Sequence, residues 1–411
     1  MKSATAAAFS LLSAAAVRQR CHRMLGFGLD GALRHFDVEL ERLDAAADLS
    51  IACMRRAYPL LDVPLHSRWR HFMVDGEDRW ANLEKASAWR DTAERARAAF
   101  DLAIVSVLLD AGADRRWRYR DAATGKSFGR SEGLALASLE MFAAGGFSQD
   151  ALRPLRVDAS ALKGLSAHAL GQYFQVTPAN PLPALTGRLR LLQRLGEVVA
   201  NNADVFARAD APRPGGLFDY LVAGGDSASI AAPSLLAEIL RQLGSIWPGR
   251  LVLAGVPLGD CWRHPALVTD DSTSELVPLH KLSQWLAYSL IEPLQAAGLI
   301  VADIDGLTGL AEYRNGGLLI DAGVLVLREE AAAKIAHRVD ATLVVEWRAL
   351  TVALLDRLAG TIRQRLGLDA ATLPLGKVLQ GGTWAAGRAA AASRREDGAP
   401  PLTVISDGTV F

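Results

Sequence analysis

Two segments place polar and aromatic side chains inside stretches of sequence that are otherwise aliphatic. They span residues 277–288 and residues 307–317. Burying a polar group without a partner costs about 2 kcal/mol or more, so polar groups in a core usually serve a site. We therefore expect the chemistry of this protein at these two segments. The side chains concerned are Lys281, Gln284, Trp285, Tyr288, Glu312, Tyr313, Arg314 and Asn315.

The first segment has helical spacing. Its four side chains, from Lys281 to Tyr288, stand at positions i, i+3, i+4 and i+7. This spacing puts a cation, an amide and two aromatic rings on one face of a helix, where they can bind a small polar ligand. The alternative is a face packed on another helix, with the Lys281 ammonium reaching out to water.

Glu312 is the candidate general base of the second segment. It precedes Gly316 and Gly317, where the missing side chains let backbone or a ligand approach closely. A carboxylate in an apolar pocket, with Lys281 or Arg314 beside it, is suited to proton transfer or to stabilising a cation. The alternative is a buried structural ion pair.

Asp260 and Trp262 follow a predicted strand, and loops after strands often carry site residues. Asp260 is a third catalytic candidate because it can bind hydroxyl groups, and Trp262 can stack on a planar group. A surface turn is an equally good interpretation. Arg130 and Glu132 stand where a helix is predicted to begin. They are either a helix cap or part of a phosphate site built on the backbone amides.

Three further residues are candidates for substrate binding. Glu346 and Arg348 interrupt a helix that is apolar nearly all round, so they are either paired in the core or turned to the pocket. Trp384 lies in a cluster with two glycines and Arg388. Each of these patterns is weak when taken alone.

A largely helical framework must position these side chains. Apolar residues recur at helical spacing over most of the chain, so we expect a mainly α, multi-helical fold with a minor β element. Helices are predicted at residues 45–57, 86–110, 132–143, 187–206, 232–243, 275–297, 331–337 and 343–366, and strands at 251–256, 299–304, 318–327 and 402–405. A weak boundary divides an N-terminal helical region, 1–180, from a C-terminal region, 181–411, that carries most of the site; one continuous domain is the alternative.

Composition narrows the class of function. The chain has 411 residues, and 45 Lys and Arg balance 45 Asp and Glu, so no net charge favours nucleic acid or a membrane surface as a partner. A small-molecule substrate fits better. The three cysteines are far apart in the sequence, so we expect no disulfide. No stretch is long and apolar enough to predict a membrane span, and we expect a cytoplasmic protein.

Several catalytic signatures are missing from the sequence. It contains no Walker loop, no HExxH motif, no paired CxxC and no Gly-x-Ser-x-Gly elbow, and no GxGxxG run follows a predicted strand. Its eight histidines form no recognisable metal set. We therefore expect chemistry that uses neither a metal nor a cofactor.

Taken together, these segments resemble the fourth uracil-catabolism protein family, also known as the uracil-regulated gene 3 family. The resemblance runs over the full length of the chain. Besides the two segments above, it is carried by residues 100–112, 130–134, 345–351 and 406–411. One departure is Gln380, which stands where the family has Glu before a Gly-Gly-Thr-Trp run. We give that position no catalytic role.

The family belongs to a route of uracil breakdown thought to open the pyrimidine ring while it is still attached to ribose. The resemblance thus implies a substrate derived from a nucleoside or nucleotide, and association with other uracil-catabolic enzymes. A second, local similarity is to the queuosine-salvage N-glycosidases, helical relatives of DNA glycosylases that carry a Lys-x-x-Gln helix followed by Asp-Tyr-Arg. Lys281 to Gln284 and residues 312–314 look like these elements in the same order, with Glu replacing Asp.

These resemblances imply a DNA-glycosylase-like helical core and an N-ribosyl hydrolase that releases urea from a ribosylurea or its 5-phosphate. Glu312 would stabilise an oxocarbenium-like state and orient water. Lys281 would protonate or hydrogen-bond the departing urea or hold Glu312 charged. Asp260 would bind ribose hydroxyls, and Trp285 or Tyr288 would cover the sugar or the ureido plane. The alternatives are another C–N hydrolysis step of the same route, or a non-catalytic partner of the ring-opening enzyme.

Overall fold

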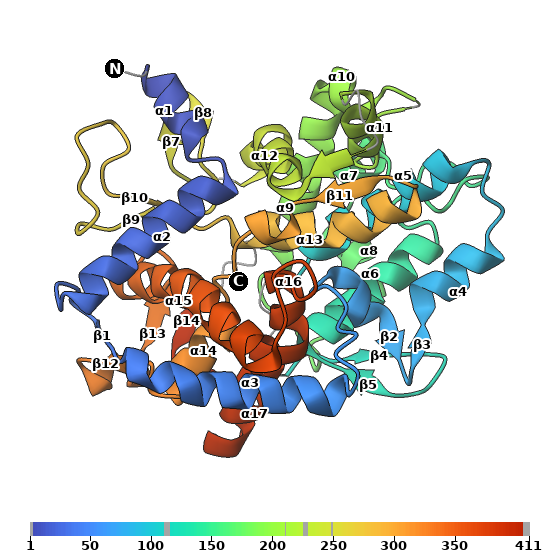
Figure 1. The fold of residues 1–411 in the computed structure, drawn as a ribbon. Coiled ribbons are helices and arrows are strands. Elements are labelled where there is room, and N and C mark those ends of the chain that lie inside the picture. The colour runs from blue at the N-terminus through green and yellow to red at the C-terminus, as the bar shows by residue number, and fades with distance from the viewer. Residues whose placement is uncertain (1–2, 111–115, 210, 225–228, 248–249, 406–411) are drawn as a thin grey trace.

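The computed structural model describes residues 3–110, 116–209, 211–224, 229–247 and 250–405, and it is mainly helical with a minor β component (Figure 1). The helices are α1 (Ala4–Ser10), α2 (Ala14–Leu29), α3 (Leu43–Ala57), α4 (Arg79–Ala86), α5 (Thr92–Leu108), α6 (Arg130–Ala143), α7 (Ala159–Gly164), α8 (Ala167–Tyr173), α9 (Leu185–Asn201), α10 (Ala203–Phe206), α11 (Gly216–Ala223), α12 (Ala232–Leu243), α13 (Lys281–Ala296), α14 (Tyr313–Asp321), α15 (Thr342–Leu366), α16 (Leu375–Lys377) and α17 (Trp384–Arg394).

The strands form short two-stranded pairs within the described residues. The antiparallel pairs are β1 (Phe36–Val38) with β12 (Leu325–Leu327), β2 (Met73–Val74) with β3 (Glu77–Asp78), β4 (Tyr119–Arg120) with β5 (Ser127–Phe128), β7 (Val252–Leu253) with β8 (Val256–Pro257), and β9 (Cys261–Arg263) with β10 (Leu276–Pro278). The parallel pairs are β6 (Ser229–Ala231) with β11 (Ile300–Ala302) and β13 (Ala336–Arg338) with β14 (Thr403–Ile405).

Three helices, α5, α13 and α15, form the centre of the core. Nearly every residue of α13 is buried, and the buried residues of α5 and α15 also extend around each helix instead of following one stripe. A helix that is apolar on all sides must be enclosed by other elements. Accordingly, α13 packs on α5 and α12, and α15 packs on α2, α3 and α14.

Local signals set the starts and ends of these helices. α5 begins at Thr92 because the side chain of Asp91 accepts a hydrogen bond from the Glu94 N–H. Gly367, with φ at +66°, ends α15, and its N–H bonds the carbonyls of the last helical turn. Gly387 lets α17 lie against α14, since a Cβ at that position would meet the carbonyl oxygen of Arg314.

Most of the predicted helices are confirmed, with different ends in two cases. Helices lie at the predicted 45–57, 132–143, 232–243 and 343–366, and the predicted 187–206 divides into α9 and α10. The predicted 86–110 helix begins only at Thr92, and the predicted 275–297 helix only at Lys281, because Leu276–Pro278 pairs as β10.

Three predictions were wrong. Residues 251–256 are not one strand but contain β7 and the start of its antiparallel partner β8. Residues 331–337 are not one helix: a 3-10 helix, Glu330–Lys334, leads into β13. The strand predicted at 318–327 is instead the end of α14 followed by the short strand β12. Leu318 and Leu319 are fully buried in α14, and a continuous apolar run reads the same way for a buried helix as for a buried strand.

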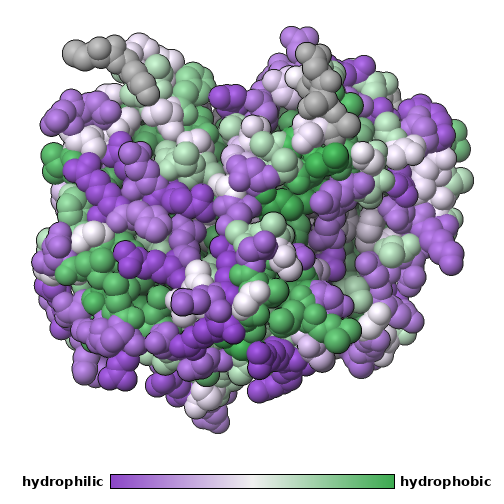
Figure 2. Space-filling view, in the orientation of Figure 1, coloured by the Kyte–Doolittle hydropathy of each residue, from purple (hydrophilic) through white to green (hydrophobic). Residues whose placement is uncertain are grey.

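Other expectations from composition can be compared with the structure. Cys21, Cys53 and Cys261 are free thiols, with the first and last buried. Among the described residues, no helix combines the length and apolarity needed to cross a membrane. Figure 2 shows hydrophilic residues over much of one face of the molecule, with hydrophobic residues in patches between them. The predicted boundary between residues 180 and 181 stays a prediction.

Candidate active site

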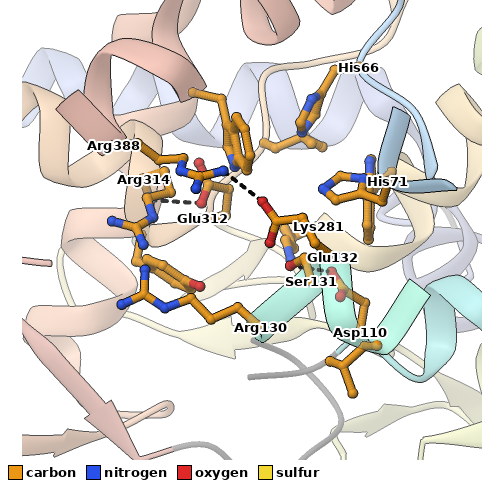
Figure 3. A pocket seen from close by; sticks show the side chains of 15 residues that line it. His66, His71, Asp110, Arg130, Ser131, Glu132, Lys281, Glu312, Arg314 and Arg388 are labelled. Carbon is orange, nitrogen blue, oxygen red and sulfur yellow. Dashed lines mark hydrogen bonds and ion pairs between the residues drawn. The ribbon is translucent and has the colours of Figure 1, made fainter. Parts of the chain in front are cut away.

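A small polar cavity lies where α6, α13, α14 and α17 come together (Figure 3). It encloses about 50 Å³, which is room for a few water molecules or the head of a small polar ligand. Residues on both sides of the predicted 180/181 boundary line it. They are His66, His71, Asp110, Arg130, Ser131, Glu132, Leu134, Lys281, Trp285, Leu310, Glu312, Tyr313, Arg314, Trp384 and Arg388.

Glu312 is fixed at the start of α14, as its N-cap. One carboxylate oxygen accepts the Arg314 N–H at 2.7 Å, and the other accepts the Asn315 N–H at 2.6 Å. Burial raises the pKa of Glu312 to about 7, although the Lys281 charge and the Asn315 N–H work in the opposite direction. Each carboxylate oxygen can accept more than one hydrogen bond. Glu312 is therefore a rigidly held base, half ionised near neutral pH.

Lys281 opens α13 and reaches the same cavity. Its own N–H donates to Asp260 Oδ2 at 2.9 Å, which fixes the first turn of the helix. Its ammonium lies 5.7 Å from the centroid of the Trp285 ring and has no carboxylate within ion-pair distance among the described residues. Burial lowers the pKa of Lys281, while the charges of Asp110 and Glu312 act to raise it. Lys281 can thus donate a proton more readily than an exposed lysine.

Aromatic rings form one side of the cavity. The His66 ring stacks on Trp285 with centroids 6.1 Å apart, and His71 meets the edge or face of both Trp285 and Trp384. Burial lowers the pKa of each histidine to about 4, so both rings are neutral near pH 7. The indole N–H of Trp285 has no hydrogen-bond partner among the described residues. This side can stack on a flat, uncharged group and donate to it.

Asp110 and its neighbours form the floor. Asp110 makes an ion pair of 3.0 Å with the buried Arg68, and it accepts a hydrogen bond from Ser131 at 3.0 Å. Sequence reasoning missed Asp110 and His66 as site residues. Asp110 did fall inside a segment that carried the family resemblance, which was the available signal; for His66 the sequence offered none.

Charged residues surround the opening. Arg388 makes an ion pair of 2.7 Å with Glu132, and its guanidinium lies 4.9 Å from the Trp384 ring centroid. Arg314 lies 5.3 Å from the ring centroid of Tyr313, and its Nη1 donates to the Gly398 carbonyl at 3.1 Å. Arg130, Glu132, Tyr313, Arg314 and Trp384, all predicted to bind substrate, are thus brought together at one cavity with Glu312 and Lys281.

Asp260, by contrast, is not among the residues that line the cavity, and its predicted role in binding ribose hydroxyls stays a prediction. Arg348 holds both carboxylate oxygens in a two-pronged ion pair, at 2.8 and 2.7 Å, and Trp262 donates to Oδ1 at 2.6 Å. These bonds lower the pKa of Asp260, with the Arg348 charge as the main cause opposing burial. Asp260, Trp262 and Arg348 have one another as partners, so they hold α13 to α15 and leave no lone pair aimed at a ligand.

Gln284 and Tyr288 also turn away from the cavity. Both bond to Thr308: the Gln284 amide oxygen accepts the Thr308 N–H at 3.0 Å, and the Tyr288 hydroxyl donates to the Thr308 carbonyl at 3.2 Å. Asn315 bonds to Thr383 at 2.8 Å and to the Leu310 carbonyl. These three side chains therefore position the segment before Glu312 and the π-helix, Val378–Thr383, that leads into α17.

Glu346 is buried in a different part of the core. Its Oε1 accepts the N–H groups of His35 and Phe36 at 3.0 and 2.9 Å, and its Oε2 lies 3.4 Å from the His264 ring. Of the two interpretations of the sequence, pairing within the core is the one that the structure bears out.

Comparison with known proteins places the chain in a family. Residues 10–411 match the family described as "Protein of unknown function (DUF1688)". The chain belongs to the DUF1688 family. A similar member is uracil catabolism protein 4 of Lachancea kluyveri, 37% identical over 414 residues that cover 93% of each chain. Another is protein urg3 of Schizosaccharomyces pombe, 36% identical over 411 residues that cover 98% of each chain.

Four of the segments that carried the resemblance to this DUF1688 family meet at the cavity. Residues 100–112 supply Asp110, residues 130–134 supply Arg130 and Glu132, residues 277–288 supply Lys281, and residues 307–317 supply Glu312 and its neighbours. Residues 111–112 and 406–411, which also carried it, lie outside the described residues. Among the described residues, no group of three or more His, Cys, Asp and Glu side chains has the arrangement of a metal site.

Proposed function

We propose that this DUF1688 protein acts in uracil catabolism, the process after which one of its relatives is named. We propose further that it is an N-ribosyl hydrolase that releases urea from a ribosylurea. The observation that carries this proposal is the placement of Glu312 and Lys281. A buried carboxylate with a pKa of about 7 and a buried ammonium line one small cavity beside neutral aromatic rings.

The reaction would break the bond between C1 of ribose and a urea nitrogen. As this bond lengthens, positive charge develops on the sugar, and the Glu312 carboxylate stabilises it. Glu312 also takes a proton from the attacking water, whose oxygen forms the new bond to C1. Lys281 gives a proton to the departing nitrogen. The proton that Glu312 took from water then passes to Lys281, which restores both side chains. The products are free ribose and urea, with one water consumed.

The shape and chemistry of the cavity suit a ureido group. Urea is flat and neutral, and the neutral rings of His66 and His71 line the cavity beside Trp285. The unpaired indole N–H of Trp285 can donate to the urea oxygen. Since the cavity is small, the ureido group would fill its enclosed end while the sugar extends toward the opening.

The test is a product assay with synthetic ribosylurea and with its 5-phosphate. We expect the purified protein to release urea and sugar in equal amounts, and Glu312→Ala to abolish both. Ammonia and carbon dioxide in place of urea would show cleavage within the ureido group instead. If neither compound is consumed by folded wild-type protein, N-ribosyl hydrolysis is ruled out for these substrates.

A further inference from the structure

The charges that line the cavity do not balance. Three carboxylates line it, and each already faces a cation: Asp110 pairs with Arg68, Glu132 pairs with Arg388, and Glu312 faces Lys281. Two guanidinium groups remain, on Arg130 and Arg314. Neither has a carboxylate within ion-pair distance in the described part of the chain.

These two arginines share one side of the opening. Figure 3 shows the guanidinium groups of Arg130 and Arg314 on the same side of the cavity, away from His66, His71 and Asp110. Both act on the same phenol: Arg314 lies 5.3 Å from the Tyr313 ring centroid, and the Arg130 charge opposes the rise that burial causes in the pKa of Tyr313. Two unneutralised cations and one phenol hydroxyl therefore gather at one place.

Neither the burial of Arg314 nor the backbone conformation of Arg130 is favourable by itself. Arg314 is only 5% exposed, and the one bond it makes to protein oxygen leaves most of its five N–H donors unused. Arg130 has φ at +51°, a left-handed conformation that costs a non-glycine residue free energy. Leaving two cations without an anion in a partly buried site is costly, unless a ligand supplies the negative charge.

We propose that Arg130 and Arg314, with the Tyr313 hydroxyl, form a subsite for the phosphate of a pentose 5-phosphate. The position of the sugar in this inference rests on the proposed function. The substrate class that follows is the phosphorylated ribosylurea. A phosphate monoester carries close to two negative charges, which match the two free cations. Its oxygens also fit the planar fork of a guanidinium group.

The direction of the ligand agrees with this assignment. Glu312 and Arg314 both line the cavity, so a sugar whose C1 lies at Glu312 can reach Arg314 with its other end. The aromatic side then receives the ureido group and the arginine side receives the phosphate. One pentose separates the two groups.

The experiment measures the binding of ribose 5-phosphate and of ribose by calorimetry, which requires no turnover. We expect wild type to bind ribose 5-phosphate at least about tenfold more tightly than ribose, as hydrogen bonds to a charged group imply. Arg130→Gln should weaken ribose 5-phosphate binding about 10- to 100-fold and leave ribose unaffected. Arg130→Lys keeps the charge but loses the planar guanidinium group. Its affinity for ribose 5-phosphate should therefore lie between the affinities of wild type and Arg130→Gln. Arg56→Gln removes an exposed arginine that is not among the residues lining the cavity, and it serves as the matched control.

Equal binding of the two sugars by wild type would overturn the phosphate subsite, and this result does not depend on any variant folding. An effect of Arg130→Gln no larger than that of Arg56→Gln would also overturn it. If ribose 5-phosphate binds as expected while neither ribosylurea is hydrolysed, the subsite stands and the hydrolase proposal fails. If ribosylurea is hydrolysed without any preference for phosphate, only the subsite fails.

Discussion

Replacing Glu312 by Gln tests whether this side chain is a base or only a helix cap. The substitution keeps the length of the side chain and one acceptor oxygen for the first turn of α14, but it removes the charge. In the wild type, burial raises the pKa of Glu312 from 4.5 to about 7. At about 1.4 kcal/mol for each pKa unit, ionising this buried group costs the folded state about 3 kcal/mol.

The sign of the pH dependence follows from the raised pKa. Below about pH 4.5 the Glu312 carboxyl is protonated in both the folded and the unfolded state, so its burial does not lower the free energy of unfolding through ionisation. As pH rises to about 7, the unfolded chain releases its proton first, so the free energy of unfolding falls. Relative to Glu312→Gln, the free energy of unfolding of the wild type should therefore fall by about 2.5 kcal/mol between about pH 5 and about pH 8. Urea unfolding of the two proteins at both pH values measures this difference.

Activity should show the same ionisation in the opposite sense. Because only the carboxylate can accept a proton, kcat/KM of the wild type should rise with pH through about 7. Glu312→Gln should lose about 10²- to 10⁴-fold and no longer show this rise. Glu346→Gln is the matched control, since Glu346 also holds two backbone N–H groups in the core but lies outside the cavity. If Glu312→Gln keeps the rise and a rate within about threefold of wild type, Glu312 is a cap and not a base.

Two further substitutions test the surroundings of Glu312. Lys281→Met removes a charge that lowers the pKa of Glu312, so the rise in kcat/KM should move above pH 7; a pH profile with an unmoved midpoint would show that Lys281 does not act on Glu312. Asp260→Asn removes one partner of the buried Arg348 ion pair, so urea unfolding should show a loss of about 3–5 kcal/mol with KM unchanged. A raised KM with normal stability would instead return Asp260 to the substrate site.

The sequence was sufficient for the fold class because the helices bury wide apolar faces. α12 lies at the predicted 232–243, where a Pro near the start and a strongly amphipathic pattern mark it clearly. The run at 318–327 was misread because only a short apolar stretch of α14, Leu318–Ile320, follows Gly317, and so short a stretch shows no periodicity that separates helix from strand.

For the site, the sequence could select unusual polar residues but not the direction in which each points. Lys281 and Glu312 line one cavity, while Gln284, one helical turn from Lys281, bonds to Thr308 instead. Asp260 looked like a ligand because its partner Arg348 lies 88 residues away, and no local pattern shows that the two neutralise each other. Only the tertiary structure distinguishes a buried pair from a group that awaits a ligand.

The cavity combines side chains from distant parts of the sequence, from His66 to Arg388. A ribosome makes the chain in one direction, so α17 and its Trp384 are made after the other elements that line the cavity. Closing contacts across such a span is slow, and intermediates that precede it expose apolar surface. The cavity can therefore be completed only after α17 has been made, and the polar and aromatic groups of its lining remain open to water until then.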